Sequence, residues 1–257
     1  MPIGVSKLAA ASASSSQRSR RRQRNPSSAS SSLGGIPTAS KKSAIQTIYD
    51  VSKDVFAAAA PGFQPLPSDV ARLSGFLNGL KLQDVGLDAS MPYLRADPDE
   101  GHPTVTYLHF ADSPKLTFGV FCLPESAVIP LHDHPGMTVF SKILLGSMHI
   151  KSYDWVKTPP TGARLAKLKT DTIFDASSET VVLYPENGGN LHCFTAATPC
   201  VVLDVMGPPY CQTQGRDCAY YDVKATRGGE DGQYAWLKQV RCTFKIDTFH
   251  MGLNIRK

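Results

Sequence analysis

The chain has 257 residues, of which 42% are hydrophobic and 19% charged, and its formal net charge at pH 7 is +5. Eight of the 27 basic residues but none of the 22 acidic residues precede Asp50, so residues 50–257 carry 19 basic against 22 acidic side chains, a net charge of −3. This balance argues against a folded domain built to bind nucleic acid. No apolar run approaches the roughly 20 residues that span a bilayer, so we expect neither a membrane segment nor a specific nucleic-acid partner.

Residues 1–42 form the first predicted segment. They are rich in Ser, Ala and Arg and contain almost no large apolar residues, so they cannot bury enough surface to offset the entropy of ordering. We predict a disordered tail, and any nucleic-acid binding should be weak and lost with it. Its basic cluster, Arg18–Arg24, is typical of a nuclear-import signal, the whole segment is also similar to an organelle transit peptide, and a functionless solvated tail is the remaining alternative.

Six cysteines are scattered along the chain without CxxC pairs, and no apolar signal-peptide core opens the sequence. They are Cys122, Cys193, Cys200, Cys211, Cys218 and Cys242. This pattern favours free thiols in a reducing compartment. We therefore expect a soluble intracellular protein, in the nucleus, the cytoplasm or both.

Two short helices are predicted next. Apolar residues recur at helical spacing from Ser43 onwards, until Pro61 and Gly62 stop the run. A second helix is predicted after Ser68 and Asp69, which can cap its N-terminus. Its expected apolar side consists of Val70, Leu73, Phe76, Leu77 and Leu80.

After Pro103 the pattern changes to short β-prone runs bounded by Gly, Pro and Asp, which is typical of an all-β sandwich or barrel. The predicted strands are Thr104–Phe110, Leu116–Leu123, Val128–His132, Met137–Leu145, Ser147–Trp155, Ala163–Leu168, Thr180–Tyr184, Leu191–Ala196, Cys200–Met206, Ala219–Val223 and Ala235–Phe244. The sequence contains no internal repeat, phosphate-binding loop or GxSxG elbow. We expect one β domain over residues 43–257.

A motif at residues 130–137, Pro-Leu-His-Asp-His-Pro-Gly-Met, is the strongest indication of chemistry. Because successive side chains of a strand point to opposite faces, His132 and His134 share one face and can bind one metal ion. The alternative is a strand with two solvent-facing imidazoles. A third ligand is needed, and the best candidate is His192, which follows a Gly-Gly-Asn turn that could return it to the interior. Three neutral imidazoles would leave a divalent ion its full charge and several open positions.

Four other histidines, His102, His109, His149 and His250, lack such a context and are predicted to be ordinary surface or hydrogen-bonded residues. Asp204 is more informative because it interrupts the apolar strand at residues 200–206. An unpaired buried carboxylate is costly, so Asp204 should be either exposed or paired.

Two groups of residues carry a resemblance to a known fold family. His132-Asp133-His134 with Gly146, and Pro185 with Gly189-Asn190-Leu191-His192, resemble the two motifs of the cupin barrel. Many cupins have a glutamate ligand shortly after the histidine pair, whereas Met137–Val139 occupy that stretch here, so the site resembles the three-histidine thiol dioxygenase branch. Within it, residues 129–137, 147–155 and 184–194 are similar to plant cysteine oxidases, relatives of animal cysteamine dioxygenase, and the resemblance extends over roughly residues 43–257.

This resemblance implies an all-β cupin barrel, a double-stranded β-helix or jelly roll, with short N-terminal helices. It implies one non-haem Fe(II) bound by the three histidines and O₂ as co-substrate. The implied reaction converts the N-terminal cysteine of a protein to cysteine sulfinic acid. In plants the implied substrates are regulators that begin Met-Cys, such as group-seven ethylene response factors, and oxidation directs them to the N-degron pathway in hypoxia sensing.

The resemblance also implies roles for three further residues. Asp204 would help position the substrate by contacting the ammonium group of the substrate. The alternative is that Asp204 is an exposed or structural carboxylate. Tyr210 would lie near the cavity, where it could hydrogen-bond an iron–oxygen species or simply pack against the barrel mouth. Cys218 matches a family cysteine, and animal relatives can form a cysteine–tyrosine crosslink nearby; a bystander thiol is the alternative reading.

Two other functions remain open at this point. Three histidines with an open position also make a zinc hydratase or hydrolase site, in which the metal acidifies water. A non-enzymatic cupin could instead bind a small ligand in its barrel. We expect a monomer that acts on proteins with an N-terminal cysteine.

Overall fold

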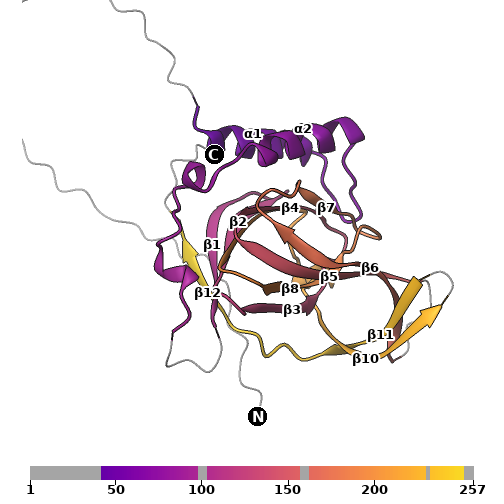
Figure 1. Cartoon of the computed structure of the whole chain (residues 1–257). Helices are drawn as coiled ribbons and strands as arrows, with labels where there is room; N and C mark the ends of the chain where they lie inside the picture. Colours follow the sequence, from indigo (N-terminus) through magenta and orange to yellow (C-terminus); the bar gives the residue numbers. More distant parts are fainter. Residues whose placement is uncertain (1–41, 98–102, 157–161, 230–231, 252–257) are drawn as a thin grey trace, which may run out of the picture. The chain divides into compact units, whose positions relative to one another are not determined.

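The computed structural model describes residues 42–97, 103–156, 162–229 and 232–251, which are mainly strands (Figure 1). The predicted tail lies outside these residues except for Lys42, whose Nζ is 2.7 Å from a carboxylate oxygen of Asp50. His102 also lies outside them. Within the described ranges, no helix is long and apolar enough to cross a membrane.

Two α-helices precede the strands: α1 (Ala44–Val55) and α2 (Pro67–Asn78). The Ser43 hydroxyl caps α1 by accepting a hydrogen bond from the Gln46 N–H at 3.2 Å. Short 3₁₀ helices follow at Leu82–Val85 (η1) and Pro92–Leu94 (η2), and a third lies at Gln212–Gln214 (η3).

The predicted start and apolar side of α2 were partly wrong. The helix begins one residue before Ser68, at Pro67, whose fixed φ suits the first helical position without a side-chain cap. Leu73 and Leu77 are buried as expected, but Phe76 is 44% exposed because one residue along a helix turns the side chain by about 100° away from Leu77.

Twelve strands follow the two α-helices in the described chain. They are β1 (Val105–Asp112), β2 (Thr117–Leu123), β3 (Val128–His132), β4 (Thr138–Leu145), β5 (Ser147–Trp155), β6 (Arg164–Asp175), β7 (Val181–Leu183), β8 (Leu191–Ala196), β9 (Cys200–Gly207), β10 (Tyr220–Gly229), β11 (Gly232–Val240) and β12 (Ile246–His250). One sheet has the order β12-β1-β2-β9-β4-β7, and the other closes on itself as β10-β11-β6-β5-β8-β3.

The eight strands β2 to β9 have the topology of a cupin barrel. Counted from β2, the first sheet contains strands 1-8-3-6 and the second contains strands 2-7-4-5. This interleaved order is that of a double-stranded β-helix, a jelly roll made of two facing antiparallel sheets. The predicted fold class is therefore confirmed.

Some strand bounds were wrong where the strands are exposed. β6 continues to Asp175 rather than ending at Leu168, and its Ala166–Asp175 part pairs with β5. β10 continues to Gly229 and pairs with β11. Most side chains in these two continuations are exposed, so no apolar pattern marks them in the sequence. β12 was not predicted at all. It is mostly exposed and pairs in parallel with β1, so no buried alternation marks it in the sequence.

The core lies on both faces of the first sheet. Helices α1 and α2 cover its outer face (Figure 1). There the rings of Tyr49 and Phe118 stack with their centroids 6.2 Å apart, and those of Phe56 and Phe140 meet edge-on at 6.0 Å. A separate cluster fills the space between the sheets and includes Met148, Phe194 and Val202. The barrel interior is thus packed rather than open.

The turn between β4 and β5 requires glycine. Gly146 has a φ of +77°, and a Cβ there would collide with the carbonyl oxygen of Pro199. We expect Gly146→Ala to lower the free energy of unfolding by roughly 2–4 kcal/mol, measured by urea denaturation. Gly215→Ala is the matched control, because its φ is +67° but no atom lies near the added Cβ, so only about 1–2 kcal/mol should be lost. Equal losses in both variants would contradict the clash.

Candidate metal centre

Three histidines meet inside the barrel. His132 ends β3, His134 lies in the turn that follows, and His192 is the second residue of β8, in register with His132. Their exposed fractions are 8%, 3% and 2%, and their ring centroids are 4.6–5.0 Å apart. One nitrogen from each ring lies within 4.8 Å of the others. The structure thus brings together the three residues predicted as metal ligands.

Hydrogen bonds to the other ring nitrogens orient two of these imidazoles. The Nδ1 of His132 lies 2.8 Å from the Pro130 carbonyl oxygen, so Nδ1–H donates and Nε2 keeps its lone pair. The Nδ1 of His134 lies 2.7 Å from the Tyr210 hydroxyl, which itself donates to the Asp133 carbonyl oxygen at 3.1 Å. The phenol oxygen therefore accepts from His134, and the Nε2 of that ring is also left free to bind a metal.

The spacing of His134 and His192 and the charge state of all three rings fit a divalent transition metal. The Nε2 atoms of His134 and His192 are 3.2 Å apart. Two nitrogens about 2.1 Å from one ion would be separated by about 3.0–3.4 Å at octahedral to tetrahedral angles. Burial lowers the pKa of His132 to about 4 and holds the pKa values of His134 and His192 well below their usual range. All three rings are therefore neutral at pH 7, the form that binds metal.

Asp133, the residue between the paired histidines, is bound to another segment. Its carboxylate accepts hydrogen bonds from the Ala219 N–H at 3.0 Å and the Tyr221 hydroxyl at 2.8 Å. Since Tyr220 pairs with His132 in the ladder, Asp133 fastens the start of β10 to the histidine motif. The strand was expected to carry both histidines, but β3 ends at His132, and Asp133 and His134 lie in the turn that follows.

The glycine turn before His192 is also present. Gly188 and Gly189 have φ values of +86° and +84°, and their N–H groups donate to the Asp154 carboxylate at 3.3 and 2.7 Å. A Cβ at Gly189 would collide with the Ser152 hydroxyl. The turn is therefore anchored on β5, and β8 begins at Leu191, one residue before His192.

Asp204 is buried, which removes the exposed alternative. It lies on β9, is 3% exposed and faces the barrel interior, on the same side as Val202. Its carboxylate has a hydrogen bond with Ser141, its neighbour on β4, while Oδ1 has no partner among the described protein atoms. Burial, partly offset by the Ser141 bond, raises the pKa of Asp204 to about 7.

A small cavity connects this region with the histidines. It has a volume of about 30 Å³, enough for a water molecule, and Ser141, Ser152, His192 and Phe194 are among the residues that line it. Ser141 thus contacts Asp204 and also borders the space beside a proposed ligand. The sequence offered no signal for Ser141, a lone serine in an apolar strand.

Tyr210 and Cys218 lie near the histidines, but on the side away from the ligand nitrogens. The hydroxyl of Tyr210 is directed at the Nδ1 of His134, so it holds the ring rather than facing an open metal position. Cys218 is half-buried beside the hydroxyls of Tyr210 and Tyr220, and burial raises its thiol pKa to about 12. All six cysteines lie in the described ranges and are free, as expected.

The contact between Tyr210 and His134 leads to a prediction. Tyr210→Phe removes the acceptor for the Nδ1–H of His134, so the ring loses its orientation and metal affinity should fall about 10-fold. Competition with a chromophoric chelator would measure this. Tyr221→Phe is the control, because that phenol donates to the Asp133 side chain and not to a ligand ring. An unchanged affinity in Tyr210→Phe would contradict the orienting role.

The remaining described histidines do not join the cluster. The Nε2 of His149 is 2.7 Å from a carboxylate oxygen of Asp171, and the Nε2 of His109 is 3.2 Å from one of Asp112. His250 packs edge-on against His109, with ring centroids 5.0 Å apart. All three behave as ordinary hydrogen-bonded or surface residues, as predicted.

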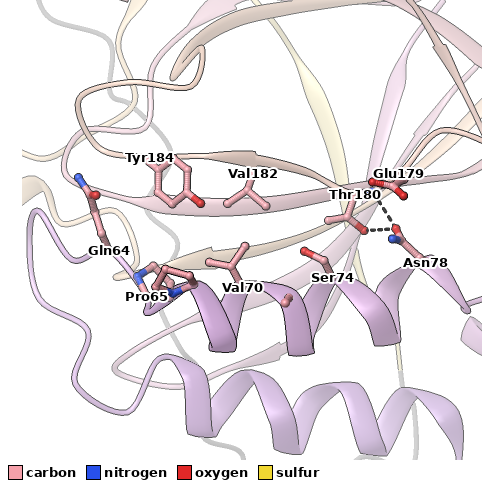
Figure 2. Close-up of a pocket in the computed structure, with 11 residues that line it drawn as sticks. Gln64, Pro65, Val70, Ser74, Asn78, Glu179, Thr180, Val182 and Tyr184 are labelled. Carbon is pink, nitrogen blue, oxygen red and sulfur yellow. Dashed lines mark hydrogen bonds between the residues drawn. The ribbon is translucent and has the colours of Figure 1, made fainter.

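A larger cavity of about 540 Å³ lies between α2 and β7 (Figure 2). Its lining contains one carboxylate, Glu179, and neither histidine nor cysteine. The side-chain Oδ1 of Asn78 accepts hydrogen bonds from the N–H and the hydroxyl of Thr180, both at 2.7 Å, and so ties α2 to the barrel. The residues around this cavity offer no metal-binding set.

The chain is similar to known proteins over most of its length. Residues 76–251 match the PCO_ADO family. The chain is 45% identical to plant cysteine oxidase 1 of Arabidopsis thaliana, covering 77% of this chain and 73% of that protein. It is 46% identical to plant cysteine oxidase 2 of the same plant, over 79% and 80% of the two chains. It is 30% identical to 2-aminoethanethiol dioxygenase of Homo sapiens, over 68% and 71%.

Proposed function

Because this chain belongs to the PCO_ADO family of thiol dioxygenases, we propose that it oxidises the N-terminal cysteine of protein substrates to cysteine sulfinic acid. One Fe(II) would be held by His132, His134 and His192, and O₂ would be the second substrate. Both oxygen atoms of O₂ end on the cysteine sulfur, so no external reductant is needed. Family membership leaves no support for the non-enzymatic alternative.

The observation that carries this proposal is the ligand set itself: three neutral, buried imidazoles without a carboxylate. Such a set leaves a divalent ion electrophilic enough to bind a thiolate, with open positions for O₂ beside it. Bound iron would supply the redox chemistry. The described residues hold the imidazoles in place: Pro130 orients His132, and Tyr210 orients His134.

Asp204 is proposed to position the substrate. Its Oδ1 is buried and has no partner among the described residues, and such a group is costly unless something pairs with it. The α-ammonium of an N-terminal cysteine is a cation of the right charge to provide that pairing. Ser141 would hold the other side of the carboxylate toward the barrel interior.

The proposed biological substrates are regulators that begin Met-Cys, with group-seven ethylene response factors as the leading class. Support comes from the 45–46% identity to two plant cysteine oxidases. Their oxidation would feed the N-degron pathway and make their lifetime depend on oxygen supply.

We also propose that the protein is present in both the nucleus and the cytoplasm. The basic cluster Arg18–Arg24, which is typical of a nuclear-import signal, supports this. Fluorescent fusions with and without residues 1–42 would test this.

A peptide assay tests the reaction. The Fe(II)-loaded protein is incubated in air with a peptide that begins Cys-Gly-Gly, and mass spectrometry should detect the addition of two oxygen atoms, both from ¹⁸O₂ when labelled gas is used. A peptide with the same cysteine placed second is the control and should remain unmodified. Iron-loaded protein that leaves the first peptide unchanged would refute the proposal. Turnover that needs zinc and consumes no O₂ would favour the hydratase or hydrolase alternative.

A further inference from the structure

The side chain of Asn190 makes four contacts with backbone groups. Its side chain is 5% exposed. Its Oδ1 accepts a hydrogen bond from the His134 N–H at 2.9 Å, and its Nδ2 donates to the His134 carbonyl oxygen at 3.1 Å. The same Nδ2 lies 3.0 Å from the Tyr184 carbonyl oxygen and 3.4 Å from that of Met137. The amide thus satisfies backbone groups of two separate turns.

These contacts matter because His134 lies beyond the end of its strand. β3 ends at His132, which is held in the sheet by its pairing with His192 and Tyr220. His134 has no such partner strand. The side-chain amide of Asn190 forms hydrogen bonds with both the backbone N–H and the backbone C=O of His134, as a neighbouring strand would do.

Asn190 also lies only two residues before His192, immediately before the first residue of β8. The turn that precedes it is closed by a hydrogen bond from the Tyr184 N–H to the Asn187 carbonyl at 2.9 Å and is anchored on Asp154. One side chain therefore links the backbone of one proposed ligand to the strand that carries another, across 56 positions of sequence.

We propose that Asn190 is a positioning residue that sets His134 relative to His192 and thereby determines the affinity and geometry of the metal site. The role requires a side chain that is acceptor and donor at once. Aspartate has the same size and keeps the acceptor, but it loses the donors and faces three carbonyl oxygens. Alanine removes all four hydrogen bonds. This inference rests on the proposed metal centre and not on the identity of the substrate.

Metal binding by the full chain tests this role separately from catalysis. The dissociation constant for Co²⁺ is measured by competition with a chromophoric chelator, together with the visible absorption bands of the bound ion. Asn190→Asp and Asn190→Ala are each expected to weaken binding about 10- to 100-fold and to shift the Co²⁺ bands. If Asn190→Ala does not fold, Asn190→Asp still decides the question.

Thr138→Val is the matched control. Thr138 is fully buried, and its hydroxyl donates to the Phe63 carbonyl oxygen at 2.6 Å, linking segments 75 positions apart without touching a histidine. This variant should lower the melting temperature of the metal-free protein while Co²⁺ affinity and spectrum stay unchanged. Unchanged affinity and bands in Asn190→Asp, or equal changes in Thr138→Val, would overturn the role of Asn190. A wild-type chain that binds no Co²⁺ would overturn the metal centre itself.

Discussion

Replacing His132, His134 or His192 by alanine, one at a time, is expected to abolish metal binding and activity together. The cluster contains three imidazoles and no carboxylate, so the loss of one leaves two ligands, too few to retain a divalent ion against dilution. We expect kcat/KM to fall at least about 1000-fold, which corresponds to roughly 4 kcal/mol of transition-state stabilisation. Metal content by mass spectrometry and O₂ consumption with a Cys-Gly-Gly peptide would measure both effects.

His149→Ala serves as the control for this series. Its imidazole is partly exposed and is bound to Asp171 on the strand beside it, away from the cluster. This variant should keep one metal ion per chain and wild-type turnover. Thermal unfolding of each metal-free variant would establish that the barrel still folds. Full metal content and turnover in any one of the three alanine variants would remove that histidine from the ligand set.

Asp204→Asn is expected to have opposite effects on stability and activity. Burial raises the pKa of Asp204 to about 7 in the folded chain, against about 3.9 in an unfolded one. Between these values the folded state keeps a proton that the unfolded state has released, so stability falls as pH rises from about 4 to about 7. At about 1.4 kcal/mol per pKa unit, the penalty above pH 7 is on the order of 4 kcal/mol.

Asparagine carries no charge at any pH and so avoids this penalty. In urea unfolding of the metal-free protein, Asp204→Asn should exceed the wild type in stability at pH 8 and differ little from it near pH 4. Activity should change in the other direction, because the amide cannot form an ion pair with a substrate ammonium; a loss of about 100-fold in kcat/KM is expected.

A second carboxylate offers a control of opposite sign. A hydrogen bond from Lys151, assisted by one from His149, lowers the pKa of Asp171. A lowered folded pKa means stability that is present at neutral pH and lost as pH falls through that value. Asp171→Asn should therefore be slightly less stable than the wild type at pH 8 and retain activity. The buried-charge account of Asp204 would be wrong if the difference in unfolding free energy between Asp204→Asn and the wild type were the same at pH 8 as at pH 4.

The sequence pattern predicts those helices and strands whose formation depends on residues close together in the chain. Each element that was missed or misplaced has a physical reason. The interior strands were located because buried and exposed side chains alternate along them, as in β8 around His192. The part of β6 beyond Leu168 and the edge strand β12 are mostly exposed, so no buried face marks them in the sequence. The cap of α2 was misplaced because Pro67 can begin a helix without one.

Most of the candidate site followed from local rules. The two-residue period of a strand predicts that His132 and His134 share a face and that Asp133 does not, and the positive φ values of Gly188 and Gly189 agree with the turn expected before His192. What only the tertiary structure decided are the contacts between distant segments. Tyr210 reaches a ring nitrogen 76 positions away, and Asn190 pairs with a peptide 56 positions away. The pKa of Asp204 is set by its burial and its hydrogen-bond partners, which depend on the segments that pack together across the barrel. These long-range contacts cannot be derived from the composition of the chain or from the spacing of its motifs.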